Sequence, residues 1–132
     1  MKIELFAMCD AATDSGGKLN ILGAFDTIGA AKVPAVHPRC AIVVKIRFER
    51  IERGEHRLKL NIIDQDGGFI IPPLEAPLAV SFPDAQPSAT AQLILDLHNL
   101  KFAKFGEFSI DLAVDGRQEA SIPLFIRQAA TV

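Results

Sequence analysis

The sequence predicts an all-β protein, an antiparallel β-sandwich of eight to nine strands, from three observations. Apolar and polar side chains alternate in several segments, which is the pattern of strands with one buried face. Turn-forming residues separate these segments about every ten residues. No segment has the length and the period of a convincing long helix. Together these features are typical of a sandwich or a barrel.

The N-terminal part of the chain predicts a hairpin. Residues 2–11 form its first strand, residues 13–17 a turn with a Gly-Gly tip, and residues 18–28 its second strand. Gly23 interrupts the alternation of the second strand, and a glycine at such a place marks a bulge or a close backbone approach. Residues 29–39 contain two prolines and little periodicity, so we expect a connection between layers.

Residues 40–64 are predicted to form one central β-hairpin. Apolar side chains at alternate positions share one face of each arm. Lys45 and Arg47 point the other way on the first arm, and Arg57 and Lys59 do so on the second. Because such a hairpin cannot bury its apolar face alone, the rest of the chain must supply a second layer.

The stretch after this hairpin predicts a turn and a sheet edge. Residues 64–68 are turn material, and residues 72–87 contain five prolines with a short strand at 78–82. Proline cannot donate a hydrogen bond to a ladder, so this strand belongs at a sheet edge.

The C-terminal part predicts three more strands. Residues 90–100 read as a strand, with a helix as the competing interpretation. Residues 106–114 and 117–126 alternate around Asp115-Gly116, the strongest short hairpin signal in the chain. We therefore expect a single domain over residues 1–127 and a loose tail at 128–132.

The composition of the chain limits the classes of function that it can have. The 132 residues are 49% hydrophobic with a formal net charge of −2, so no global field recruits nucleic acid or an anionic membrane. The N-terminal apolar stretch is too interrupted for a signal peptide, and no run is long enough for a membrane span. The two cysteines, Cys9 and Cys40, lie far apart in the sequence. We expect a cytoplasmic protein with reduced thiols.

Two resemblances add to this interpretation. Residues 93–97, 105–110 and 122–124, together with the Asp-Gly turn, resemble the closing strands of immunoglobulin-like sandwiches. The chain has no Tyr and no Trp, so the tyrosine corner and the Cys…Trp…Cys signature of true immunoglobulin domains are missing. Over its full length the chain resembles a family of short bacterial single-domain proteins described as a domain of unknown function. The resemblance rests on the first strand, on residues 22–25, and on residues 105–108 with the Asp-Gly turn. It implies a bacterial sandwich protein and assigns no activity or site residue.

The candidate interaction face is the basic group Lys45, Arg47, Arg57 and Lys59. On a hairpin these side chains would form a local basic patch, which could receive an acidic protein surface or an anionic ligand. The competing interpretation is internal neutralisation by Asp111 from a neighbouring strand, helped by acidic residues at the hairpin end. Nucleic acid is the least favoured ligand, because no aromatic residue interleaves the basic ones.

A weaker candidate is a Ca²⁺ site at acidic loops. Asp64 and Asp66 start like a calcium loop, and Asp10 or Asp14 could add oxygens. Calcium takes six to eight oxygen ligands, and a plain Asx turn is the favoured interpretation of residues 64–68.

No catalytic motif is present in the sequence. It contains no Gly-x-Ser-x-Gly elbow and no phosphate-binding glycine loop, and its three histidines are scattered. The sequence therefore favours a non-enzymatic interaction or assembly module without cofactor, bound to a protein partner or to its own copies. The contact surface would be a sheet edge or the basic face. A Ca²⁺- or small-ligand-binding sandwich is the alternative, and a hydrolase whose site assembles only in the fold is a third hypothesis.

Overall fold

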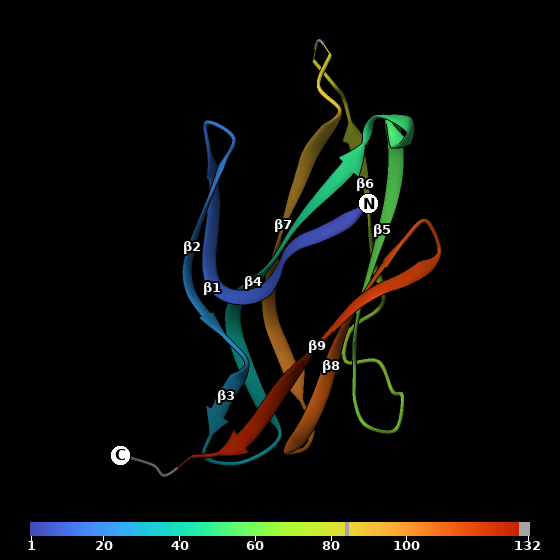
Figure 1. The fold of residues 1–132 in the computed structure, drawn as a ribbon. Coiled ribbons are helices and arrows are strands. Elements are labelled where there is room, and N and C mark those ends of the chain that lie inside the picture. The colour runs from blue at the N-terminus through green and yellow to red at the C-terminus, as the bar shows by residue number, and fades with distance from the viewer. Residues whose placement is uncertain (84, 130–132) are drawn as a thin grey trace.

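The computed structural model describes residues 1–83 and 85–129 and contains two β-sheets (Figure 1). Nine strands and one 3-10 turn make up the regular structure of these residues. The elements are β1 (Lys2–Ser15), β2 (Lys18–Phe25), β3 (Thr27–Ala30), β4 (Ala35–Glu49), η1 (Arg50–Glu52), β5 (Gly54–Ile63), β6 (Leu74–Val80), β7 (Ser88–Phe102), β8 (Gly106–Val114) and β9 (Arg117–Gln128).

The first sheet has the strand order β2-β1-β4-β7 and the second has the order β3-β9-β8-β5-β6. All neighbouring strands are antiparallel except β3 and β9, which run parallel. The inward side chains of both sheets meet in one buried apolar cluster. The predicted all-β class and its mostly antiparallel, two-layered organisation are confirmed. Within the described residues, no helix is long and apolar enough to cross a membrane.

Side-chain alternation builds this core from both layers. On β8 the inward residues are Phe108, Ile110, Leu112 and Val114, as the sequence predicts, and each is buried. Their partners across the core include Ile42 and Phe48 on β4, which are fully buried. About 25 cal/mol of stabilisation accompanies each Å² of apolar surface removed from water, so these facing rows contribute much of the folding free energy.

The β1–β2 hairpin forms around Gly16-Gly17, as predicted. The single second strand predicted at residues 18–28 is wrong in part, because β2 ends at Phe25 and Thr27 begins β3, which belongs to the other sheet. β1 curves sharply along its length, so that its first half pairs with β4 and its second half with β2 (Figure 1). At the hairpin tip, Gln92 Nε2 of β7 donates to Asp14 Oδ2 at 2.7 Å. A second, smaller apolar cluster lies on the outer face of the first sheet, with buried Cys9, Ala41 and Val43 at its centre. β4 is therefore covered on both faces.

The prediction of one central hairpin over residues 40–64 is wrong. β4 pairs with β1 and β7, whereas β5 pairs with β6 and β8, so the two arms belong to different sheets. The turn η1 carries the chain from one sheet to the other, and Glu49 and Glu52 form a capping box at its start. Alternation reports that a strand has a buried face. It cannot distinguish two strands that lie side by side from two that face each other across a core.

The other predicted segments are mostly confirmed, with shifted ends. Residues 90–100 form a strand, β7, and not a helix. The proline-bearing strand β6 is the outermost strand of its sheet, and Asp115-Gly116 forms the β8–β9 turn with positive φ at both residues. The predicted connection at residues 29–39 is wrong in part, because β3 ends at Ala30 and β4 begins at Ala35.

The C-terminal tail predicted at residues 128–132 is partly ordered. Gln128 ends β9, and the backbone N–H of Ala129 donates to the carbonyl oxygen of Ala30 at 2.9 Å. The remainder of that prediction, residues 130–132, lies outside the described residues.

Candidate functional site

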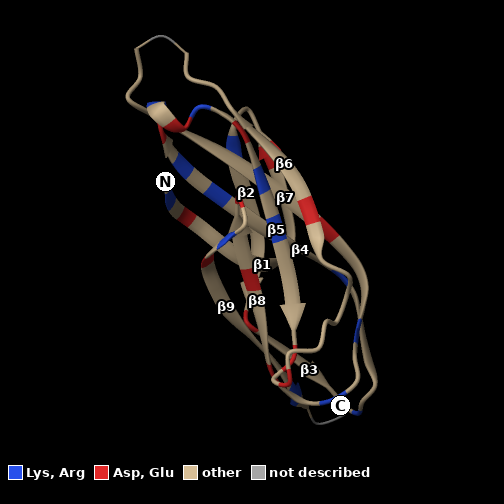
Figure 2. Cartoon of the chain, turned by 90° about the vertical axis from the view of Figure 1, so that its right-hand side faces the viewer, with Lys and Arg blue, Asp and Glu red and all other residues tan. Residues whose placement is uncertain are grey.

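The four basic residues do not share a face. Lys45 and Arg47 point outward from β4 in the first sheet, and Arg57 and Lys59 point outward from β5 in the second. The outer surfaces of the two sheets look in opposite directions, so no single partner surface can touch all four. Figure 2 shows charges of both signs distributed over the strands.

Lys45 and Arg47 both pair with Glu4. β1 bulges between Ile3 and Leu5, and this bulge lies beside the two basic residues. Glu4 Oε2 accepts from Arg47 Nε at 2.6 Å, and Lys45 Nζ lies 3.9 Å from the other carboxylate oxygen. The hydrogen bond from Arg47 lowers the pKa of Glu4, and the same bond raises the pKa of Arg47. Part of the internal neutralisation expected from the sequence exists on this sheet, but Glu4 provides it and balances one of the two positive charges.

Asp111, the residue expected to provide it, lies elsewhere. β8 is a neighbour of β5, not of β4, and Asp111 faces Asn61 in the register. Its Oδ1 accepts hydrogen bonds from Ser109 Oγ and from Ser121 Oγ at 2.6 Å. The expectation was wrong because it followed from the hairpin that does not form.

Arg57 and Lys59 remain on the outer surface of the second sheet. In the β5–β6 register Lys59 lies opposite Glu75 and Arg57 lies opposite Pro77. Neither basic side chain takes part in an ion pair with another described residue. The two residues are a small basic group rather than a face.

Asp64 and Asp66 form an Asx turn that a lysine covers. Asp64 Oδ1 accepts from the backbone N–H groups of Asp66 at 2.9 Å and Gly68 at 2.8 Å, which lowers its pKa. Lys104 Nζ lies 2.8 Å from Asp66 Oδ2 and 3.8 Å from Asp64 Oδ2. The ammonium group of Lys104 thus pairs with both carboxylates that the sequence suggested as calcium ligands.

The other two candidate calcium ligands are engaged elsewhere. Asp14 lies at the β1–β2 tip, where its Oδ1 accepts from Gly17 N at 3.0 Å. The Asp10 carboxylate lies against Gly23, so close that a Cβ at Gly23 would come within 2.4 Å of Asp10 Oδ2. Among the described residues, no group of three His, Cys, Asp or Glu side chains is placed to hold a metal ion.

The two cysteines are buried thiols on opposite faces of the first sheet. Cys9 faces Ala41 in the register and belongs to the outer apolar cluster, whereas Cys40 projects into the main core. Neither is joined in a disulfide. Burial raises the pKa of the Cys40 thiol to about 11 and also raises that of Cys9. Both thiols are therefore poor nucleophiles.

Sheet edges are the other candidate surface. Three of the four edges are protected by devices that natural sheets use against unwanted pairing. β3 has only four residues, β6 contains Pro77, and β2 is interrupted by Gly23 with φ of 66°. The part of β9 beyond β3 contains Pro123.

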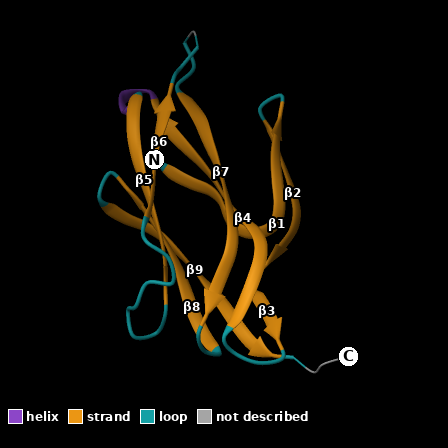
Figure 3. Ribbon diagram, turned by 180° about the vertical axis from the view of Figure 1, so that it is seen from behind, coloured by secondary structure: helices purple, strands orange, loops and turns teal. Residues whose placement is uncertain are grey.

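β7 is the fourth edge, and its Ser88–His98 part has none of these devices, whereas Asn99 beyond that part has φ of 53°. It extends over 15 residues, Ser88–Phe102, without proline or glycine, and lies at the border of the first sheet (Figure 3). Its register with β4 is continuous from Ser88 to His98, and the only charged residue before His98 is Asp96. Leu93 and Leu95 point toward the core but are only partly buried. The absence of proline and the low charge of this stretch are sequence signals of a free edge. The prediction from the sequence that the proline-bearing strand is an edge does not use these signals.

Comparison with known proteins gives a family without a described activity. No curated protein and no solved structure was found to match the sequence. One family model, described as a family of unknown function (DUF6941), matches residues 4–127. Because that match covers nearly the whole chain, the protein belongs to the DUF6941 family.

Proposed function

We propose that the protein is a non-enzymatic assembly module that associates with a second copy of itself through the free edge of β7. The single observation that supports this most is the contrast between the edges: the Ser88–His98 part of β7 is long, regular and unprotected, and the other edges are short or interrupted. A free edge presents a row of backbone N–H and C=O groups that another strand can pair with.

A second copy fits this edge for two physical reasons. Two β7 strands related by a twofold axis would run antiparallel and close a symmetric dimer. Since Ser88–Leu97 contains one charged residue, Asp96, the two copies would meet without a row of like charges. The partly buried Leu93 and Leu95 would gain cover from the partner strand, which adds apolar burial to the new hydrogen bonds.

The four basic residues favour this edge over a charged docking face. Glu4 already pairs with Lys45 and Arg47, and Arg57 and Lys59 lie on the other sheet. The calcium-binding alternative has less support, because Lys104 pairs with Asp64 and Asp66.

The proposal includes an immunoglobulin-like organisation, a bacterial origin and a cytoplasmic location. Immunoglobulin-like domains place strands A, B and E in one sheet and C, F and G in the other. The partition of β1, β4 and β7 from β5, β8 and β9 supports that likeness. Two unpaired, buried thiols are consistent with a reducing compartment.

Sedimentation velocity over a range of protein concentrations tests the proposed self-association. We expect the wild-type protein to shift from monomer to dimer as concentration rises. The variant Thr90→Lys/Asp96→Lys places positive charge at two exposed positions of β7 and should remain monomeric at the same concentrations.

The matched control is Glu75→Lys/Ala79→Lys on β6, which makes the same change in net charge at two exposed positions of a proline-bearing edge. This variant should dimerise like the wild type. A wild-type protein that stays monomeric at every concentration overturns the proposal, as does equal dimerisation of both variants. Thermal melting checks that each variant is folded.

A further inference from the structure

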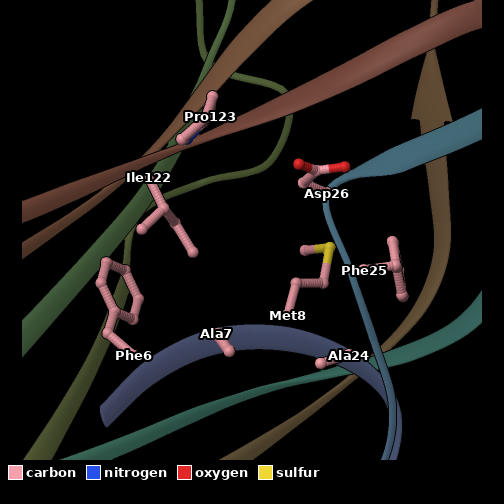
Figure 4. A pocket seen from close by; sticks show the side chains of 8 residues that line it. All are labelled: Phe6, Ala7, Met8, Ala24, Phe25, Asp26, Ile122 and Pro123. Atoms are coloured by element: carbon pink, nitrogen blue, oxygen red, sulfur yellow. The ribbon is translucent and has the colours of Figure 1, made fainter. Parts of the chain in front are cut away.

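An apolar cavity of about 450 Å³, wide open to solvent, lies between the two sheets on the side opposite β7. Three separate segments surround it: the middle of β1, the crossing from β2 to β3, and β9 (Figure 4). Its volume lies within the range of about 300–1,000 Å³ that is usual for small-molecule sites. Apart from two alanines, the lining residues are Phe6, Met8, Phe25, Asp26, Ile122 and Pro123.

The cavity exists because of the way the chain changes sheets. β2 ends at Phe25 and the chain enters the second sheet as β3 at Thr27. β3 pairs with β9 only along Phe125–Gln128, so the preceding part of β9 has no strand on that side. The space beside Ile122 and Pro123 therefore stays open between β9 and β1.

The lining combines an apolar interior with a single carboxylate. Figure 4 shows Phe6 and Ile122 on one side, Phe25 and Asp26 on the other, and Met8 between them. Asp26 is the only charged residue among those that surround the cavity. None of the ion pairs between described residues includes Asp26.

Hydrogen bonds hold this carboxylate in place. The carbonyl oxygen of Asp26 accepts from the backbone N–H of Phe125 at 2.7 Å, which fixes the crossing segment against β9. Asp26 Oδ1 accepts from Thr27 Oγ1 at 2.8 Å. Oδ2 makes no hydrogen bond to a described residue and is available to a ligand at the mouth of the cavity.

We propose that this cavity binds a small organic cation, an amine or quaternary ammonium group carried on an aromatic or aliphatic body. The carboxylate of Asp26 would pair with the positive charge, and the faces of Phe6 and Phe25 attract cations through their ring quadrupoles. The apolar part of the ligand would be buried against Met8 and Ile122. An anionic ligand would meet the charge of Asp26 in an otherwise apolar site, so the cavity selects against it.

The two methionines of the chain provide the measurement, because only Met8 lines the cavity and Met1 is at the N-terminus. In protein labelled with ¹³C at the methionine methyl groups, phenethyltrimethylammonium should shift the Met8 signal in a saturable way and leave Met1 unchanged. The neutral analogue 2-phenylethanol should bind at least several-fold more weakly, and 3-phenylpropanoate more weakly still.

The variant Asp26→Asn isolates the charge, since the amide oxygen can still accept from Thr27. It should weaken binding of the cation about fivefold, the factor that corresponds to about 1 kcal/mol for an exposed ion pair, and should not change binding of the alcohol. Asp96→Asn, a neutralisation of an exposed carboxylate on β7, is the matched control and should bind like the wild type.

Phe25→Leu tests the contribution of the aromatic ring. It should weaken binding of the cation more than binding of the alcohol. The proposal is overturned if the Met8 signal does not saturate with the cation, or if the alcohol or the carboxylate binds as tightly. Equal affinity of the wild type and Asp26→Asn for the cation overturns it as well. None of these outcomes depends on whether β7 mediates dimerisation.

Discussion

His56 Nδ1 lies 2.6 Å from Asp115 Oδ2, so the start of β5 is tied to the turn between β8 and β9. The other ring nitrogen, Nε2, lies 2.6 Å from the carbonyl oxygen of Glu52, and the ring stacks on Phe48. Both partners are acceptors, so the doubly protonated imidazolium satisfies both contacts. Burial of the ring by itself lowers the pKa of His56, but the hydrogen bonds to Asp115 and Glu52 outweigh it and the pKa is raised.

This ion pair predicts a pH dependence of stability on the alkaline side. The pKa of His56 in the folded protein is raised above its ordinary value of 6.5, so its contribution is fully present below that pH and is lost as the pH rises through the folded-state pKa. The pKa of Asp115 is lowered from 3.8 by the bonds from His56 and Arg57, so its contribution is lost as the pH falls through that lowered value. The pair stabilises most between about pH 4 and 6.5.

Urea unfolding of Asp115→Asn at pH 5.5 and at pH 9 measures this dependence. Asn tolerates the positive φ of the turn and can still accept from the Arg57 N–H, so the variant removes mainly the charge. The free energy of unfolding should fall well below that of the wild type at pH 5.5, with a much smaller difference at pH 9. Gln in place of the exposed His98 is the control, and a gap that does not change with pH would contradict the prediction.

Gly23 is predicted to resist substitution more strongly than the turn glycines. Alanine there would adopt φ of 66° and would clash with the Asp10 carboxylate at 2.4 Å. The left-handed backbone conformation costs an alanine about 1–2 kcal/mol, and the clash with Asp10 adds to this cost. Gly17→Ala is the matched control, because its φ is also positive but its Cβ meets no atom within 4 Å. Denaturant unfolding should show Gly23→Ala to be less stable than Gly17→Ala, and the additional loss should shrink when Asp10→Ala is also present.

The division of the basic residues between two sheets predicts how they couple. Arg47→Gln and Glu4→Gln should show a favourable coupling free energy in a double-mutant cycle, and 1 M salt should reduce it because both groups are exposed. Arg47→Gln and Arg57→Gln should be additive, since the residues point away from each other on different sheets. Coupling between the two arginines would mean that they share a face after all.

Calcium is predicted to leave the melting temperature unchanged at millimolar concentration. The Asp64 turn offers two carboxylates, already paired with Lys104, where calcium requires six to eight oxygens. Differential scanning calorimetry with and without Ca²⁺ is the measurement. A rise that disappears in Asp64→Ala/Asp66→Ala would instead support the calcium-binding interpretation.

The sequence predicted the strands well because each depends on local pattern. The alternation at residues 106–114 and the Asp-Gly turn contain all the information that the β8–β9 hairpin needs. Strand partners depend on longer-range geometry. Between the apolar parts of β4 and β5, residues 49–55 are all charged or glycine except Ile51, and such a segment is equally typical of a hairpin loop and of a crossing between sheets.

One overlooked signal bears on that error. Residues 40–44 are apolar without interruption, which is typical of a strand covered on both faces. A half-exposed hairpin arm does not need Ala41 and Val43 to be apolar. The prediction of a shared basic face was wrong together with the hairpin, because the surface to which a side chain points depends on the sheet that contains its strand. The cavity beside Asp26 depends on three segments distant in sequence, and no local pattern indicates it.

The double cover of β4 has a consequence for how the family can vary. Five successive residues, Cys40–Val44, are at most 1% exposed, so substitutions at even and at odd positions disturb one apolar cluster or the other. A saturation mutagenesis map should therefore show an unbroken intolerant block in β4, whereas β8 should tolerate every second substitution. In this segment of β4 the protein has little freedom to change.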